Sequence, residues 1–153
     1  MQLNDFTNDD FENIYSFMKP LWLETYGGFL PNGQILFLLD KYFSPAGLKS
    51  YREKGYRYKK IDDAGVLVFV ERETDVYIDK LYLTPNARGK GYAKFVYDEL
   101  LKLGKPLLLN VNQNNERAVA CYLKNGFEIV EQTDIELGNG MINRDYVMQK
   151  KKR

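Results

Sequence analysis

The stretch that decides the fold is Leu81–Lys94, which reads LYLTPNARGKGYAK. A strand pattern ends before Thr84-Pro85, and a helical pattern begins near Gly91. Between them, residues 88–91 (RGKG) bring two glycines and two cations to the start of the helix. Free backbone N–H groups at a helix start attract anions, and glycine lets a phosphate approach the backbone without a Cβ clash. The stretch predicts an anion site, with a structural turn of incidental charge as the alternative.

Two other phosphate-binding loops do not fit these residues. The dinucleotide-binding fingerprint requires a third glycine or an alanine where Lys94 stands. The phosphate loop of nucleotide hydrolases requires Gly-Lys followed by serine or threonine, whereas the Gly-Lys pairs here are followed by Gly91 and Pro106. The anion site therefore indicates another class of protein.

The composition excludes several kinds of catalysis. The chain has 153 residues, of which 44% are hydrophobic, and this suits a single domain over residues 1–153. It has no histidine, which excludes Ser-His-Asp and Cys-His catalysis and histidine-bound zinc. Its one cysteine, Cys121, can form no internal disulfide or metal cluster, so we expect no metal and a reducing compartment. Because it has no membrane-length apolar run and no signal sequence, we expect a soluble, cytoplasmic protein that does not bind membranes.

The other patterns predict helices, then antiparallel strands, then alternating strands and helices. Helices are expected at Asp9–Met18, where Pro20 interrupts the pattern, at Gln34–Phe43, and from Ser44-Pro45 towards Lys54, with a loop at Tyr26–Gly33. An antiparallel meander is expected from the strands Tyr56–Ile61, Val66–Arg72 and Val76–Leu83. The later elements are a helix at Gly91–Leu103, a buried strand at Leu107–Val111, a helix at Asn115–Asn125, and a hairpin of Phe127–Leu137 and Met141–Lys150 around Gly138-Asn139-Gly140. This order indicates a mixed α/β sheet.

A second informative segment covers residues 107–127, LLLNVNQNNERAVACYLKNGF. Asn115, Ala118 and Tyr122 share one face of the expected helix. The Tyr122 hydroxyl can therefore reach the end of the preceding strand. The alternative is that Tyr122 packs in the core with its hydroxyl hydrogen bonded to backbone. The segment alone leaves both interpretations open.

Together, the two segments resemble the core of the GNAT superfamily of N-acetyltransferases, which use acetyl-coenzyme A. The family's loop, Gln/Arg-x-x-Gly-x-Gly/Ala, is matched by Arg88, Gly91 and Ala93. Its later motif, an asparagine followed seven residues on by tyrosine and then by Gly-Phe, is matched by Asn115, Tyr122 and Gly126-Phe127. The resemblance implies a mostly antiparallel, twisted sheet with a central parallel pair of strands that splay apart, and with flanking helices.

The resemblance also implies where acetyl-coenzyme A binds as co-substrate. The amides of Arg88, Gly89, Lys90, Gly91, Tyr92, Ala93 and Lys94 would hold the pyrophosphate. The backbone of Leu81, Tyr82 and Leu83 would contact the pantetheine arm and the thioester, and Asn115 would touch the arm from the other side. The reaction implied is direct attack of a neutral primary amine on the thioester, with Tyr122 as general acid to the departing thiolate. Cys121 is expected to be a small buried packing residue.

One departure from the family concerns the general base. Some members carry a glutamate on the strand after the loop helix, and the matching residue here is Asn110. An amide cannot remove a proton, so the base must lie elsewhere, be a water chain, or be unnecessary. Asp79 is our candidate, because alternation places it on the same strand face as Leu81. The alternative is a solvent-facing or ion-paired carboxylate.

The charge distribution suggests the kind of acceptor. Residues 1–40 carry six acidic and one basic residue, and the family likeness places this segment over the acceptor end. We expect a cationic small-molecule or peptide amine, with Trp22, Tyr26 and Phe29 as aromatic walls. The alternatives are a non-catalytic coenzyme A sensor and an RNA-acting enzyme that uses the basic residues 41–60, although a net charge of +1 does not favour a nucleic-acid partner. The acceptor's identity, a role for the basic tail at 150–153, and a homodimer stay open.

Overall fold

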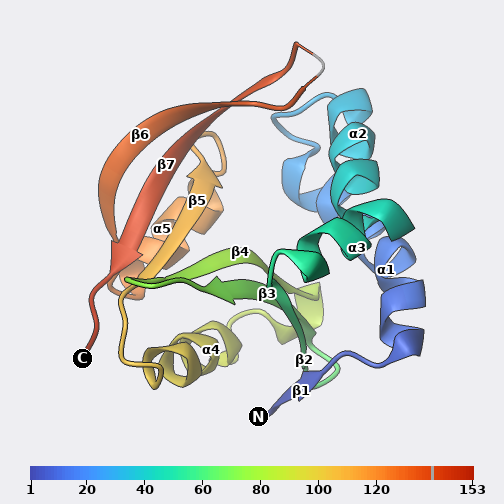
Figure 1. Cartoon of the computed structure of the whole chain (residues 1–153). Coiled ribbons are helices and arrows are strands. Elements are labelled where there is room, and N and C mark those ends of the chain that lie inside the picture. Colours follow the sequence, from blue (N-terminus) through green and yellow to red (C-terminus); the bar gives the residue numbers. More distant parts are fainter. Residues whose placement is uncertain (139) are drawn as a thin grey trace.

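The computed structural model describes residues 1–138 and 140–153, and its seven strands form one sheet in the order β1-β2-β3-β4-β5-β7-β6 (Figure 1). The strands are β1 (Leu3–Asp5), β2 (Arg57–Ile61), β3 (Gly65–Glu71), β4 (Val76–Leu83), β5 (Leu107–Asn112), β6 (Glu128–Glu136) and β7 (Ile142–Lys150). The helices are α1 (Asn8–Tyr26), α2 (Asn32–Phe43), α3 (Pro45–Glu53), α4 (Tyr92–Leu101) and α5 (Glu116–Lys124), with a 3₁₀ turn at Pro85–Ala87. The predicted meander of β2, β3 and β4 is confirmed, and so is the mixed α/β class.

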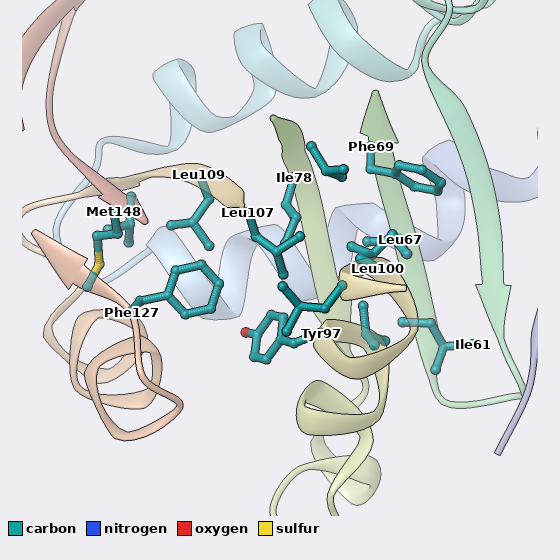
Figure 2. Close-up of a cluster of buried hydrophobic side chains, with 14 residues drawn as sticks. Ile61, Leu67, Phe69, Ile78, Tyr97, Leu100, Leu107, Leu109, Phe127 and Met148 are labelled. Atoms are coloured by element: carbon teal, nitrogen blue, oxygen red, sulfur yellow. The ribbon is translucent and has the colours of Figure 1, made fainter. Parts of the chain in front are cut away.

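Each face of the sheet has its own hydrophobic core. On one face, α4 and α5 pack over β4 and β5, and Tyr97, Phe127 and Met148 are almost fully buried there (Figure 2). On the other face, α1, α2 and α3 cover β2 and β3 with Met18, Ile35 and other apolar side chains (Figure 1). The sheet therefore separates two layers of helices, and a path between them must pass through the sheet.

Such a path begins where β4 and β5 part. These two strands are parallel and pair only at Val76↔Leu107, Tyr77↔Leu108 and Ile78↔Leu109. Both strands continue beyond that point without pairing to each other, so the predicted splay is present. A β-bulge lies at the same place, because consecutive β3 residues pair with Lys80 and Ile78 and leave Asp79 unpaired.

The β6–β7 hairpin arches from the far edge of the sheet towards α2 (Figure 1). Leu137 at its end is buried in the second core, and the Gln34 side chain of α2 donates a hydrogen bond of 3.2 Å to the Asn143 Oδ1 atom of β7. Gly138 and Gly140 adopt the positive φ expected of a turn, while Asn139 lies outside the described residues. The hairpin thus closes one side of the space above the splayed strands.

Two sequence predictions fail near the N-terminus. Helix α1 does not end before Pro20 but continues to Tyr26, within the segment expected to be a loop. Proline removes one helical hydrogen bond at a cost of about 3 kcal/mol, whereas each large apolar side chain buried contributes about 2 kcal/mol. Met18, Leu21 and Trp22, on either side of Pro20, are all buried, so their burial outweighs the lost bond. The short strand β1 was not predicted.

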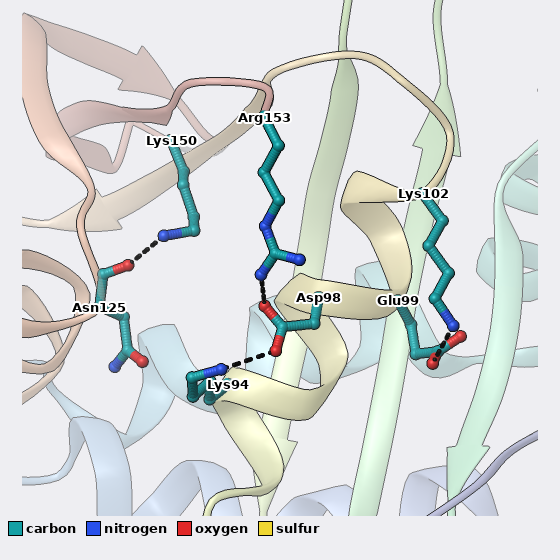
Figure 3. Close-up of polar contacts among 7 residues, drawn as sticks. All are labelled: Lys94, Asp98, Glu99, Lys102, Asn125, Lys150 and Arg153. Atoms are coloured by element: carbon teal, nitrogen blue, oxygen red, sulfur yellow. Dashed lines mark hydrogen bonds and ion pairs between the residues drawn. The ribbon is translucent and has the colours of Figure 1, made fainter.

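The basic tail is partly held in place. Residues 151–153 lie outside any strand and are exposed, but the Arg153 guanidinium forms an ion pair with Asp98 of α4, which also binds Lys94 (Figure 3). Lys150 donates a 2.6 Å hydrogen bond to the Asn125 carbonyl at the end of α5. The tail therefore joins α4 to the hairpin.

Candidate active site

A cavity of about 580 Å³ passes through the gap between β4 and β5 and is lined from both layers of the protein. From the α4 and α5 layer come the loop at 88–94 and Tyr122. From the α1 and α2 layer come Trp22 and Tyr26, joined by residues of the β6–β7 hairpin. The cavity thus brings together segments that lie more than a hundred residues apart in the sequence.

The loop end of the cavity presents unpaired backbone donors. Gly91 caps α4 with a φ of 89°, and no side chain caps the helix there. The first hydrogen bond of the helix runs from the Phe95 N–H to the Gly91 carbonyl, 3.0 Å away, so the N–H groups before it have no helical acceptor. Together with the positive end of the helix dipole they can bind an anion. Gly89 also has a positive φ, of 76°, so both glycines are required by the backbone conformation.

The cations of the loop differ in their positions. Arg88 lines the cavity and forms a 2.6 Å ion pair with Glu24 of α1, which ties the loop to the other layer. Lys94 also lines the cavity and pairs with Asp98 at 2.8 Å. Lys90 is exposed and, unlike Gly89 and Gly91 on either side of it, does not line the cavity.

One edge of β4 is free at the residues predicted to contact the coenzyme. Leu81, Tyr82 and Leu83 line the cavity and pair with β3 on one side. Pairing with β5 stops at Ile78, so their other edge has no strand partner. An extended ligand can therefore hydrogen bond to this edge as a further strand would.

Tyr122 and Asn115 both line the cavity, as predicted. The Asn115 side chain caps α5 by accepting a 3.3 Å hydrogen bond from the Ala118 N–H, which fixes the start of the helix. The Tyr122 ring packs 5.6 Å from the Phe127 ring. Burial raises the pKa of the Tyr122 phenol, so it is protonated throughout the neutral range. Cys121 next to it is exposed, so its predicted burial is wrong, and it too lines the cavity.

The opposite end of the cavity is aromatic. Trp22 and Tyr26 line it, as predicted, and the Tyr26 and Tyr82 hydroxyls hydrogen bond to each other. Burial raises the pKa of both phenols. Phe29 does not line the cavity; its ring stacks edge-on against Tyr26 at 5.7 Å and supports that side chain, while Leu30 takes the lining position. The turn after α1 explains this difference, since it directs Leu30 inward.

Asp79 lies in the cavity wall but not on the predicted strand face. The bulge interrupts the alternation of β4, so that Leu81 packs in the α4 core while Lys80 faces the Tyr42 ring on the other side, 4.1 Å away. Asp79 forms a 2.6 Å ion pair with Lys80, and both side chains are largely buried. Burial works against the Lys80 ammonium, but Asp79 and Tyr42 outweigh it and raise its pKa. The ion-paired alternative for Asp79 is therefore what the structure has.

The acidic residues of segment 1–40, which led to the expectation of a cationic acceptor, do not line the cavity. Glu24 pairs with Arg88, and Asp5 and Asp10 pair with lysines of β2. The acidic side chains that do line the cavity are Asp79 and Asp145. Asp145 was not predicted from the sequence, although one signal was present: it is an acidic residue at an inward position of an alternating strand.

The described residues contain no group of three or more acidic or cysteine side chains arranged to hold a metal ion. Within the same residues, no helix is long and apolar enough to span a membrane.

Comparisons with known proteins identify the family. Residues 44–127 match the acetyltransferase (GNAT) family. A peptidyl-lysine N-acetyltransferase, YjaB, from Salmonella typhimurium is 33% identical over 63 residues, which are 41% of this chain and 43% of that protein. The matched part of the chain thus spans less than half the length of this relative.

Two solved structures share the fold over nearly the whole chain. The PaiA N-acetyltransferase of Thermoplasma acidophilum, in complex with coenzyme A, has a TM-score of 0.72 and 19% identity, covering 98% of both chains. The spermidine N-acetyltransferase of Vibrio cholerae, in complex with coenzyme A and spermine, has a TM-score of 0.64 and 18% identity, covering 99% of this chain and 95% of that one. The chain belongs to the acetyltransferase (GNAT) family, which confirms the resemblance found in the sequence.

Proposed function

We propose that the protein transfers the acetyl group of acetyl-coenzyme A to a primary amine of a cationic acceptor, either a polyamine or a lysine side chain in a peptide. The observation that carries this proposal is the single cavity that joins the loop amides, Tyr122 and an aromatic pocket through the splayed strands. A group-transfer enzyme needs its two substrates to meet at one point, and this cavity is open to both layers of the protein.

The coenzyme would occupy the half of the cavity next to α4. The unpaired N–H groups at the start of α4 would hold the pyrophosphate, with Arg88 and Lys94 nearby. The pantetheine arm would lie along the free edge of Leu81–Leu83, opposite Asn115. A backbone N–H of this edge would donate to the thioester carbonyl and stabilise the oxyanion that develops during attack.

The chemistry would be direct attack of the neutral amine on the thioester carbon. The C–S bond breaks as the tetrahedral intermediate collapses, and the sulfur takes up negative charge. Tyr122 lines the cavity, and burial raises the pKa of its phenol, so it is protonated at neutral pH. The phenol would therefore donate first a hydrogen bond and then its proton to the departing thiolate.

The aromatic half of the cavity supports a cationic acceptor. Trp22, Tyr26 and Tyr82 offer ring faces to an alkyl ammonium, and Asp145 adds a carboxylate. Two relatives support the same class, since one is named a peptidyl-lysine acetyltransferase and another a spermidine acetyltransferase. Both acceptors present a primary amine on a flexible alkyl chain.

The test is thiol release from acetyl-coenzyme A with a panel of polyamines, lysine-containing peptides, aminoglycosides and free amino acids. We expect spermidine or a lysine-containing peptide to give the highest catalytic efficiency. This efficiency should fall as the ionic strength rises, because salt screens the attraction of a cationic acceptor. An acidic N-terminal peptide as the best acceptor, without dependence on salt, would contradict it. Release of thiol that no amine stimulates would contradict the transferase function itself.

A further inference from the structure

Asp145 is a buried carboxylate that no positive charge among the described residues neutralises. The residue is 6% exposed, lines the cavity, and its Oδ1 atom has no hydrogen-bond partner among the described residues. Within the described part of the chain, no ion pair includes it, whereas Asp79, the other acidic residue of the cavity wall, is bound to Lys80. A buried, unpaired acceptor is costly to folding, and such groups are retained where a ligand uses them.

The strand register shows which way Asp145 points. Leu109 on β5 and its partner Met148 on β7 both belong to the α4 core, so alternate residues of these strands face the other layer. Asp145 is paired with Asn112, and both face that layer. Asp145 therefore lies on the acceptor side of the sheet, beside the point where β4 and β5 have separated.

The neighbouring groups leave the carboxylate available. The side chains around Asp145 on the neighbouring strands are uncharged: Asn110 and Asn112 of β5 and Thr133 of β6. The negative charge of Asp145 helps to raise the pKa of two nearby phenols, Tyr26 of α1 and Tyr77 of β4. Next to it on β7, Arg144 is exposed and pairs with Asp134 of β6. Burial raises the pKa of the Asp145 carboxyl, and the adjacent Asn110 side chain only partly opposes this. A carboxylate of raised pKa is a better base than an ordinary surface acid.

We propose that Asp145 binds the ammonium group of the acceptor and removes its proton before attack. Asp145 would thus take the role of the glutamate that some family members carry at the position of Asn110. This inference rests on the proposed function. One proton moves from the ammonium nitrogen to the Asp145 carboxylate, and the neutral nitrogen then attacks the thioester. When the C–S bond breaks, Tyr122 protonates the sulfur and regains a proton from the new amide nitrogen through solvent. Asp145 releases its proton to solvent when the product leaves.

The same geometry argues against Asp79 as the base. Protonation of Asp79 would remove its charge from the 2.6 Å pair and leave the buried Lys80 ammonium without a partner, which is strongly unfavourable. Protonation of Asp145 removes an uncompensated buried charge and is favourable. Of the two carboxylates in the cavity wall, Asp145 is thus the one that can gain and lose a proton without breaking an existing contact.

The experiment compares wild type, Asp145→Asn, Asp145→Glu and Asp134→Asn with acetyl-coenzyme A and spermidine. Asp134 is a matched control on the same hairpin, because it is exposed and lies outside the cavity. We expect Asp145→Asn to lower kcat/KM by about 100-fold at neutral pH, as loss of a general base does, and to abolish the acidic limb of its pH profile. Asp145→Glu should restore part of the activity and of that limb, and Asp134→Asn should behave as wild type.

A binding measurement keeps the test independent of turnover. Calorimetry of spermidine binding to the coenzyme A-loaded protein should show weaker binding in Asp145→Asn by about 30-fold or more, as expected for the loss of a buried charge pair. Unchanged spermidine affinity together with an unchanged acidic limb in Asp145→Asn overturns the inference. If wild type shows no amine-dependent thiol release, the proposed transferase function fails, and the spermidine affinities alone then decide whether Asp145 binds amines.

Discussion

The two ends of the cavity are built in opposite ways. The proposed coenzyme end comes mainly from one continuous stretch, β4 and the start of α4, and it offers backbone N–H groups and a free strand edge. The proposed acceptor end comes from α1, α2 and the β6–β7 hairpin, and it offers side chains: aromatic rings and, among the described residues, an unpaired carboxylate. A site made of backbone groups depends on the fold and on glycine, whereas a site made of side chains can change its acceptor by substitution.

This difference predicts that substitutions at one end leave binding at the other end intact. The largest effect is expected at Gly91. Gly91→Asp places a negative charge where we propose that the pyrophosphate binds, and like charges in contact cost several kcal/mol, so the Kd for acetyl-coenzyme A should rise by about 100-fold or more. Calorimetry measures this directly.

The control for that substitution is Gly91→Asn. Gly91 has a φ of 89°, and asparagine and aspartate tolerate positive φ to a similar degree. Asparagine therefore introduces the same backbone strain without the charge and should weaken coenzyme binding much less. Equal loss of affinity in both variants would mean that conformation alone, not an anion, explains the two glycines.

Tyr122 stands between the two ends, so its removal should affect neither substrate's affinity. Tyr122→Phe should lower kcat by about 100-fold, the ordinary contribution of a general acid, with an unchanged Kd for acetyl-coenzyme A. Tyr15→Phe on α1, outside this cavity, is the matched control. Equal kcat in wild type and Tyr122→Phe would assign Tyr122 to packing against Phe127.

At the acceptor end the expected effect is smaller. Tyr26→Phe removes the hydrogen bond to Tyr82 and leaves that buried hydroxyl without its partner. One hydrogen bond contributes about 1 kcal/mol, so the KM for spermidine should rise by about fivefold while the coenzyme Kd stays constant. A change in coenzyme affinity of the same size would show that the two ends are not independent.

The smallest effect concerns stability. Folding raises the pKa of Asp145, so the folded protein binds this proton more tightly than the unfolded chain does. The free energy of unfolding therefore falls as the pH rises from the pKa of the unfolded state through that of the folded state. Asp145→Asn removes this decrease in the free energy of unfolding. At neutral pH the variant should therefore have a Tm equal to or above that of wild type, and the gain should disappear at a pH below the unfolded pKa. A lower Tm at neutral pH would indicate a structural role.

The sequence indicated the loop of the proposed coenzyme end but not the carboxylate of the proposed acceptor end, for one physical reason. The spacing of Arg88, Gly91 and Ala93 depends on local backbone geometry, which a short stretch encodes completely. Asp145 faces the cavity only because β7 inserts between β5 and β6, and no local pattern specifies that neighbour. The face of Asp79 was mispredicted for a related reason, since a bulge set by pairing with β3 breaks the alternation.

Helix α1 illustrates the same limit. Proline inside a helix is locally unfavourable, and the sequence predicted a break at Pro20. Contacts with α2 and the sheet bury Met18 and Trp22 and override that preference. The acceptor wall at Trp22 and Tyr26 therefore depends on long-range packing.

A crystal structure with coenzyme A and spermidine bound together would show whether both substrates meet in the cavity. We expect the pyrophosphate on the N–H groups at the start of α4, the sulfur within hydrogen-bonding distance of the Tyr122 hydroxyl, and an ammonium of spermidine against Asp145 Oδ1. Both ligands would then meet in the gap between β4 and β5. Coenzyme density away from residues 88–94, or spermidine bound outside this gap, would contradict the account.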